Sequence, residues 1–99
     1  GIPYVVSTNT SVGTTSVDIN LGYRRIQPVG YITMVVSNVV PADATADLPV
    51  NITLNGTTRP LLLPNGTPVT AAELVEVNTA LLFNDRVRGL LILMSRTIA

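Results

Sequence analysis

The sequence lacks cysteine, histidine and tryptophan, and all six of its basic residues are arginines. Without cysteine the chain forms no disulfide and offers no thiol nucleophile and no sulfur ligand for a metal. Without histidine it lacks the usual general base, the commonest transition-metal ligand and the usual partner of a nucleophilic serine. The absence of lysine excludes Schiff-base chemistry and an ordinary P-loop. We therefore expect no enzyme, no catalytic residues and no cofactor.

Net charge and long apolar runs are also scarce. Six basic residues balance six acids, so no long-range field steers the chain toward nucleic acid or anionic lipid. No apolar run approaches the roughly 20 residues that a membrane-spanning helix needs. The chain has 99 residues, 46% of them hydrophobic, which is enough for one small core and too little for two. We expect a single domain over residues 1–99, with neither membrane nor nucleic acid among its partners.

What the sequence does contain is an alternation of polar and apolar residues. Residues 48–54 (LPVNITL) place their branched apolar side chains on one face, which predicts a strand with one buried face. Residues 16–21 (SVDINL) alternate in the same way. Residues 29–40 (VGYITMVVSNVV) are apolar on both faces and rich in β-branched side chains, which is typical of a central strand covered on both sides.

Turn chemistry is concentrated between residues 54 and 74. Asn55-Gly56 lies between two strand patterns and predicts a hairpin over 48–63, because both residues tolerate positive φ. Pro60 has no backbone N–H to donate, which indicates an edge strand or a bulge in the second arm. Asn65-Gly66 predicts a further turn.

A short helix and a second hairpin complete the predicted fold. Thr70 and Glu73 form the pattern of a capping box and predict a short helix near 70–76. The runs 79–85 (TALLFND) and 88–96 (RGLLILMSR) predict the hairpin. The expected fold class is mostly β, a small antiparallel β-sandwich or barrel-like domain with this one helix.

The acidic residues do not match a metal site. Glu73 and Glu76 lie three apart in the predicted helix and would share a face, as a carboxylate pair for acid-base chemistry or a hard cation requires. No histidine or lysine assists them, so stabilisation of the first helical turn by the helix dipole is the favoured explanation. Asp43 and Asp47 lack the spacing of a calcium loop. We expect no metal.

Two pairs of arginines and the three tyrosines offer an alternative, a surface for single-stranded nucleic acid. They are Arg24, Arg25, Arg86, Arg88, Tyr4, Tyr23 and Tyr31. The zero net charge and the lack of lysine favour ordinary ion pairs between these arginines and the six acids. Nucleic acid is therefore not the expected partner.

The segment from Leu48 to Leu93 resembles a β-rich module of tailed-bacteriophage structural proteins, tail fibres and other virion appendages among them. That module has a strand ending in Asn-Gly, a Pro-Leu strand, a second Gly turn, a Thr-capped turn of helix and a hydrophobic hairpin near an Asp. The matching positions here are Asn55-Gly56, Pro60-Leu61, Asn65-Gly66, Thr70 to Leu74, and Leu81 to Asp85. After Leu74 the sequence departs from the module, since Val75-Glu76-Val77 replaces its usual Ala-Gly. The first 47 residues carry no such resemblance.

The resemblance implies a non-enzymatic structural or assembly protein, such as a fibre, decoration or head-tail accessory protein of a phage or prophage. Its location would be the virion, or the cytoplasm before assembly. Its partners would be other virion proteins and copies of itself, as a trimer in the fibre case. The alternative is a surface-binding module that recognises carbohydrate or a protein receptor. That function needs an exposed aromatic cluster, which four aromatic residues barely supply.

Two sets of residues carry these expectations. A mean hydropathy of +0.45 leaves more apolar side chains than a small core absorbs, so some should contact partner subunits. The side chains expected to do so are Val35, Val40, Leu62, Leu82, Leu91 and Leu93. The residues expected to set turn and cap geometry, without binding a ligand, are Asn55, Gly56, Asn65, Gly66, Thr70 and Glu73.

Overall fold

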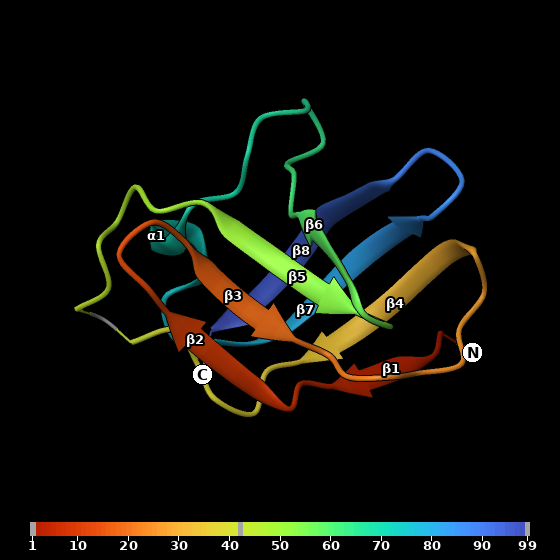
Figure 1. Ribbon diagram of the computed structural model, residues 1–99, viewed down its shortest axis with the longest axis horizontal. Helices are drawn as coiled ribbons and strands as arrows, with labels where there is room; N and C mark the ends of the chain where they lie inside the picture. The colour runs from red at the N-terminus through yellow and green to blue at the C-terminus, as the bar shows by residue number, and fades with distance from the viewer. Residues whose placement is uncertain (1, 42, 99) are drawn as a thin grey trace.

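The computed structural model describes residues 2–41 and 43–98, which form two four-stranded β-sheets packed face to face (Figure 1). The elements follow in the order β1 (Tyr4–Val6), β2 (Asn9–Val12), β3 (Val17–Asn20), β4 (Val29–Val35), β5 (Val50–Leu54), β6 (Thr57–Pro60), α1 (Ala71–Leu74), β7 (Val77–Asp85) and β8 (Leu90–Ile98). The predicted mostly β fold with one short helix is confirmed, and it is a sandwich of two sheets.

The chain passes back and forth between the sheets. Sheet A has the strand order β1-β4-β7-β8, and sheet B has the order β2-β3-β5-β6. In Figure 1 the strands of sheet B lie in front and cross those of sheet A behind. Both sheets are mixed and not antiparallel throughout as predicted, because each contains one parallel pair, β1 with β4 and β3 with β5, among otherwise antiparallel neighbours. Residue alternation predicts strands but does not distinguish these pairings, because both place side chains with a period of two.

The core lies between the sheets and is built by the inward positions of both. In β5 the buried residues alternate with half-exposed ones as the sequence predicts, and β3 buries Val17 and Ile19 in the same way. The largest fully buried side chains are Ile19, Leu21, Met34, Ile52, Leu61, Leu74, Leu82, Leu91, Val17, Val40, Val50 and Val69. Burial of such side chains at about 1.5–3 kcal/mol each is the main favourable contribution to folding.

Four of the side chains expected to face partner subunits belong to this core. Val40, Leu82, Leu91 and Leu93 are each 2% exposed or less, so the expectation that they face outward is wrong. The strands β7 and β8 are apolar on both faces, and periodicity alone cannot say which face turns toward the other sheet. Here the inward face is the one that carries Leu82, Leu91 and Leu93.

The strand predicted over residues 29–40 is shorter and less covered than expected. It lies inside sheet A between β1 and β7, but it ends at Val35. Its outward face is not covered, since Val29 and Tyr31 are each 46% exposed. The strands β1 and β2, with three and four residues, were not predicted at all.

The Asn55-Gly56 hairpin is confirmed. Asn55 and Gly56 have φ of 53° and 78°, and Leu54 pairs directly with Thr57, so β5 and β6 are joined by a two-residue turn with positive φ at both positions. This is the geometry of a type I′ turn, whose twist matches that of the flanking strands. Pro60 lies in β6, which is an edge strand of sheet B, as its missing N–H predicts.

The second turn is also present where Asn65-Gly66 predicts it. Gly66 has φ of 90° and donates its N–H to the carbonyl of Leu63, and the side chain of Asn65 accepts hydrogen bonds from the backbone and hydroxyl of Thr67. Upstream of this turn Leu62 forms a bridge with Ile92 of β8. The chain thus leaves sheet B after β6 and runs along the edge of sheet A.

The helix begins after Thr70 as predicted, but the capping box does not form. The Thr70 hydroxyl donates to the Glu73 carboxylate at 3.3 Å and makes no capping bond to a backbone N–H. The reason is that the first helical amides already have partners, because Ala71 and Ala72 donate to the carbonyls of Leu48 and Ala46 in the segment before β5, and Glu73 donates to the Thr70 carbonyl. The helix ends at Leu74, and the following residues do not continue it to 76.

Candidate functional site

The outward faces of the two sheets differ in chemistry. Residues paired directly across strands point to the same side of a sheet, so the register identifies each outward row. On sheet A, Tyr31 pairs with Phe83, Phe83 pairs with Ile92, and Ile92 forms a bridge with Leu62. Their side chains form an apolar row, in which the rings of Tyr31 and Phe83 meet edge to face with centroids 5.2 Å apart.

Further apolar side chains extend this row on both sides. The neighbouring rows contribute Tyr4, Leu81, Val6 and Val35, and the row at the other end contributes Val29 and Leu90; the uncharged polar side chains of Thr33, Thr79, Ser95 and Thr97 lie among them. Tyr4 is 71% exposed, which is high for a side chain of this size and apolar character. We call this set of outward residues the apolar face of sheet A.

The outward face of sheet B is polar. Its two rows, read across β2, β3, β5 and β6, are Ser11, Asp18, Asn51 and Pro60, and Asn9, Asn20, Thr53 and Thr58. Such a face is suited to water. One side of the sandwich is therefore built for solvent, and the other carries side chains that water solvates poorly.

Two residues expected from the sequence lie on the apolar face. Val35 and Leu62 are both half-buried and point outward, as expected for contacts with a partner subunit. Tyr31 and Phe83 form the centre of the face; the sequence suggested Tyr31 only for stacking on nucleic acid and gave Phe83 no role. The alternation of Val29, Tyr31, Thr33 and Val35 is the signal that could have found them.

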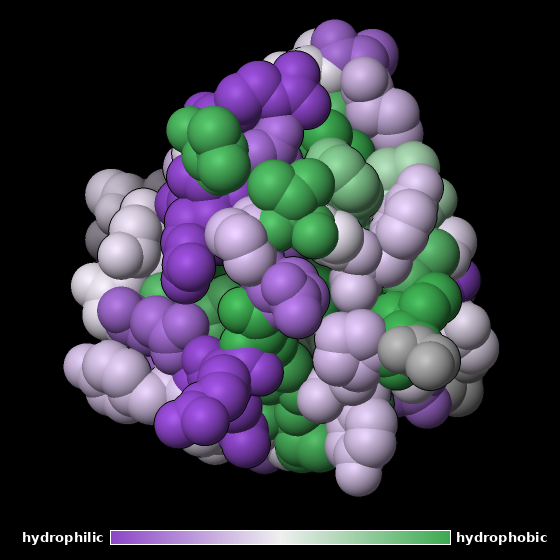
Figure 2. Space-filling model, turned by 90° about the vertical axis from the view of Figure 1, so that its right-hand side faces the viewer, coloured by the Kyte–Doolittle hydropathy of each residue, from purple (hydrophilic) through white to green (hydrophobic). Residues whose placement is uncertain are grey.

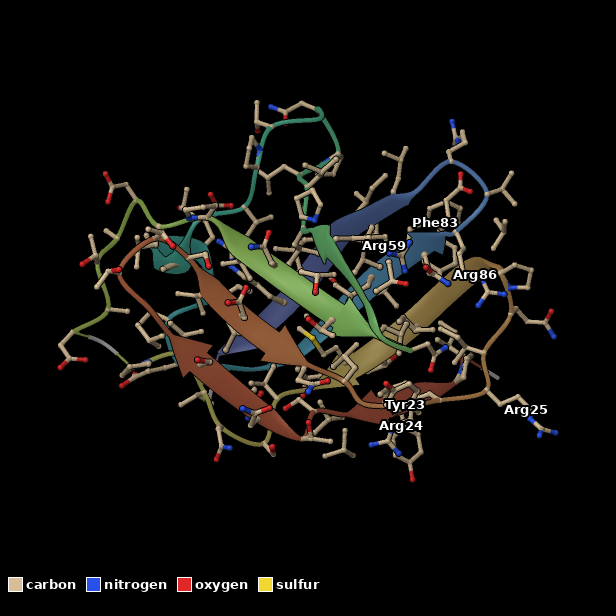
Figure 3. All side chains as sticks on the ribbon, viewed as in Figure 1. Tyr23, Arg24, Arg25, Arg59, Phe83 and Arg86 are labelled. Carbon is tan, nitrogen blue, oxygen red and sulfur yellow. The ribbon has the colours of Figure 1, made fainter. Side chains whose placement is uncertain are left out.

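A second feature is a cavity of about 300 Å³ at one end of the sandwich. It is lined by Ile26, Leu54, Asn55, Thr57, Arg59, Asn84, Arg86 and Gly89. These residues come from the β5–β6 hairpin, the end of β7, the loop between β7 and β8, and the connection before β4. Figure 3 shows Arg59 and Arg86 close together at this end, and both line what we call the arginine cavity.

Arg59 occupies an inward position on sheet B. It pairs with the core residue Ile52 across the hairpin and is only 8% exposed. Its guanidinium donates to the carbonyl of Leu90 at 3.2 Å and to Oδ1 of Asn84 at 2.8 Å. No carboxylate among the described residues bonds to it. Burial, and next the nearby charge of Arg86, lower the pKa of Arg59, while Asp85 acts in the opposite direction.

The acid nearest to these arginines is already engaged. The Asp85 carboxylate, at the end of β7, accepts hydrogen bonds from the side chain and the backbone N–H of Arg88 in the loop that leads to β8. The side-chain hydrogen bond from Arg88 is the main cause that holds the pKa of Asp85 below its ordinary value. This is the one ion pair in the part of the chain that the structure describes. The expectation that acids neutralise the arginines is thus met only by Arg88.

An open groove of about 500 Å³ adjoins the cavity and shares Ile26, Asn55 and Arg86 with it. Its other lining residues are Tyr23, Arg24 and Arg25. Figure 2 looks at this end of the molecule and shows hydrophilic residues gathered on its left half, with hydrophobic residues in the middle and at the right edge. In Figure 3 the side chain of Arg25 projects away from the sandwich.

The wall between groove and cavity is fixed by Asn55. Its Oδ1 accepts from the backbone N–H of Arg24 at 2.6 Å, and its Nδ2 donates to the Arg24 carbonyl at 2.9 Å. The Arg24 guanidinium in turn donates to the carbonyls of Leu21 and Val6. Asn55 was expected to set turn geometry, and it does, but it also holds the segment that carries Arg24.

The structure separates the residues of the nucleic-acid alternative. Arg24, Arg25, Arg86 and Tyr23 gather at the groove, whereas Tyr4 and Tyr31 lie on the apolar face of sheet A. Arg59, for which the sequence predicted no role, lines the adjoining cavity together with Arg86. The surface therefore has one exposed tyrosine among its arginines and lacks a stacking platform of several rings.

The acidic residues also differ from their expected arrangement. Glu73 lies in α1, but Glu76 follows the end of the helix with a φ of 57°, so the two do not share a helical face. In residues 2–41 and 43–98, no three acidic side chains come close enough to hold a metal ion. Over the same residues, no helix has the length and apolar character needed to cross a membrane.

No protein-family model, no curated protein and no solved structure matches this chain. The resemblance of residues 48–93 to phage structural modules stays a prediction. Function is therefore inferred from the two surfaces that the fold builds, the apolar face of sheet A and the arginine cavity.

Proposed function

We propose that this chain is a non-enzymatic structural or assembly protein that associates with copies of itself through the apolar face of sheet A. The observation that carries the proposal is the difference between the two outward faces of the sandwich. Both are built from the same kind of strand, yet the outward rows of sheet B are almost entirely polar, and those of sheet A centre on Tyr31, Phe83 and Ile92. Large contiguous apolar patches on a folded surface mark interaction sites.

The composition of the face fits the centre of an interface between subunits. Tyr4 and Tyr31, at 71% and 46% exposed, together present roughly 200–300 Å² of accessible surface, given the area of an aromatic side chain. Val6 and Val29 are 39% and 46% exposed and add to it. A standard protein interface removes about 800 Å² from each partner, and its centre is rich in tyrosine and phenylalanine and poor in charge.

A second copy of the chain is the partner that the charge pattern favours. The apolar face carries no charged group apart from the buried Asp85, which is paired with Arg88. A face without charge offers no complementarity to a strongly acidic or basic partner. Two copies of an uncharged apolar face are complementary to each other, and symmetric self-association is the commonest form of assembly.

Within this class of function, we propose a virion component of a phage or prophage, such as a fibre, a decoration protein or a head-tail accessory protein. The support is the resemblance of residues 48–93 together with a sandwich that presents an outward face centred on Tyr31, Phe83 and Ile92. Such proteins act through repeated contacts between subunits and catalyse no reaction, which agrees with the lack of cysteine, histidine and lysine in the sequence.

The test compares two variants that add the same charge to opposite faces. Tyr31→Lys places a cation at the centre of the apolar face, and Ser11→Lys places one on the exposed polar face of sheet B. Light scattering over a range of concentrations should show association of the parent chain weakened about 10–100-fold by Tyr31→Lys, because a charge would have to be desolvated. Ser11→Lys should associate like the parent. Equal effects of both variants would overturn the proposed interface.

A further inference from the structure

The arginine cavity holds more positive charge than the protein neutralises. Arg59 and Arg86 line it, and Arg24 and Arg25 stand on the adjoining groove. Among the described residues the acid near them is Asp85, at the end of β7, and its carboxylate is engaged by Arg88. The formal net charge of the whole chain is zero, so this local excess is a property of the fold and not of the composition.

The inward position of Arg59 costs free energy unless a bound group compensates for it. An arginine at an inward position facing a core residue loses much of its hydration, and buried cations are normally paired with carboxylates. A guanidinium has five N–H donors, and Arg59 uses two of them on Leu90 and Asn84. These two hydrogen bonds explain in part why Arg59 is buried, but a neutral side chain could donate them with a smaller loss of hydration free energy.

Arg86 shows no such structural use. Its backbone N–H donates to the carbonyl of Pro28, whereas its guanidinium forms no hydrogen bond or ion pair with the described residues. Its side chain is exposed and yet lines both the cavity and the groove. Arg59 from sheet B and Arg86 from the loop between β7 and β8 thus line one cavity, and the guanidinium of Arg86 makes no hydrogen bond or ion pair with the described residues.

We propose that the arginine cavity binds the phosphate group of a small organic phosphate ester. Arginine presents a planar fork of donors that matches phosphate oxygens, and two cations favour a dianion over a monoanion. A phosphate monoester carries about −1.5 to −2 charges at neutral pH. Thr57 also lines the cavity and carries a hydroxyl as a further donor.

The volume and the lining of the cavity fit an organic group as well as a phosphate. Its volume of about 300 Å³ exceeds that of the ion alone and lies at the lower end of the range for small-molecule sites. Ile26 and Leu54 supply an apolar wall beside the two arginines. The ester's organic group would contact this wall, while Tyr23, 84% exposed, stands at the open groove.

The ligand test uses compounds that share one ring and differ in the anion. Phenyl phosphate, phenyl sulfate, benzoate and phenol are titrated into the protein at low ionic strength, and binding is followed by NMR shifts of the Arg59 and Thr57 amides. Phenyl phosphate should bind at least tenfold tighter than phenyl sulfate and benzoate, and phenol should not bind. Equal binding of all three anions, or no binding of phenyl phosphate at about 10 mM, would overturn the proposal.

The variant test removes one positive charge in two places. Arg86→Gln changes an exposed cavity residue, and Arg96→Gln removes a charge from the exposed β8 position opposite Ala80, well along the strand from the cavity. Affinity for phenyl phosphate should fall at least tenfold in the first variant and stay unchanged in the second. An equal fall in both would show only general electrostatic attraction, which contradicts a specific site. Melting temperatures confirm that both variants fold.

This inference goes beyond the proposed self-association and is tested independently of it. The cavity lies at the end of the sandwich, whereas association uses the apolar face of sheet A. Arg86→Gln should leave the mass of the assembly unchanged, and Tyr31→Lys should leave phenyl phosphate binding unchanged.

Discussion

Replacing Asn55 by glycine separates two roles that this residue combines. Its φ of 53° belongs to the hairpin turn, and its side-chain amide exchanges two hydrogen bonds with the backbone of Arg24, at 2.6 and 2.9 Å. Asn55→Gly keeps a backbone that tolerates positive φ but removes both hydrogen bonds. At about 0.5–1.5 kcal/mol for each bond, the free energy of unfolding should fall by about 1–3 kcal/mol.

For a domain of this size, that loss lowers the melting temperature by roughly 5–20 °C, measurable by circular dichroism. Hydrogen exchange gives the more specific result, because the Arg24 amide loses its acceptor and should exchange faster within the folded state. Gly56→Val is the matched variant. It strains the same turn, at φ 78°, and should cost about 1–3 kcal/mol, but it leaves the Asn55 amide in place.

The Arg24 amide should therefore stay protected in folded Gly56→Val. If Asn55→Gly left both the melting temperature and the exchange of this amide unchanged, the hydrogen bonds between hairpin and groove would not contribute to stability. The turn alone would then explain the presence of Asn55.

Three further predictions follow from particular contacts. Leu82→Ala should lower the free energy of unfolding, measured by urea denaturation, by about 2–5 kcal/mol, because the side chain is fully buried; a loss below 1 kcal/mol would contradict this burial. Thr70→Ala should cost less than the roughly 1 kcal/mol of a true N-cap, because its hydroxyl makes no capping bond to the backbone; a larger loss in the same assay would contradict that geometry. Because its folded-state pKa is lowered, Asp85 stabilises the fold above its unfolded pKa near 3.8, and this contribution is lost as pH falls through the lower folded value. Melting curves should accordingly show a smaller acid-induced decrease for Asp85→Asn than for the parent chain.

Sequence reasoning succeeded where local chemistry decides the structure. Alternation in residues 48–54 and the Asn55-Gly56 pair predict the β5–β6 hairpin, because strand period and positive φ are properties of a few neighbouring residues. It failed for β1 and β2, which are too short to show a period, and for the choice of inward face in β7 and β8. That choice depends on packing against sheet B, which no local pattern encodes.

The arginine cavity was partly predictable. Once a two-residue turn is placed at Asn55-Gly56, the register pairs Leu54 with Thr57 and Ile52 with Arg59, which puts Arg59 on the inward face. The hairpin was predicted from the sequence, but the inward position of Arg59, which follows from the register of that hairpin, was not. The meeting of Arg59 with Arg86 depends on how sheet A packs on sheet B, and it needed the structure.

The central claim, self-association through the apolar face of sheet A, is tested most directly by the mass of the unmodified chain in solution. Sedimentation equilibrium from about 1 to 100 µM spans the affinities expected of a standard interface. We predict a mass of at least twice the 10.5 kDa of the chain in the upper part of this range. A mass of 10.5 kDa at every concentration would contradict the claim and leave the apolar face to a different partner.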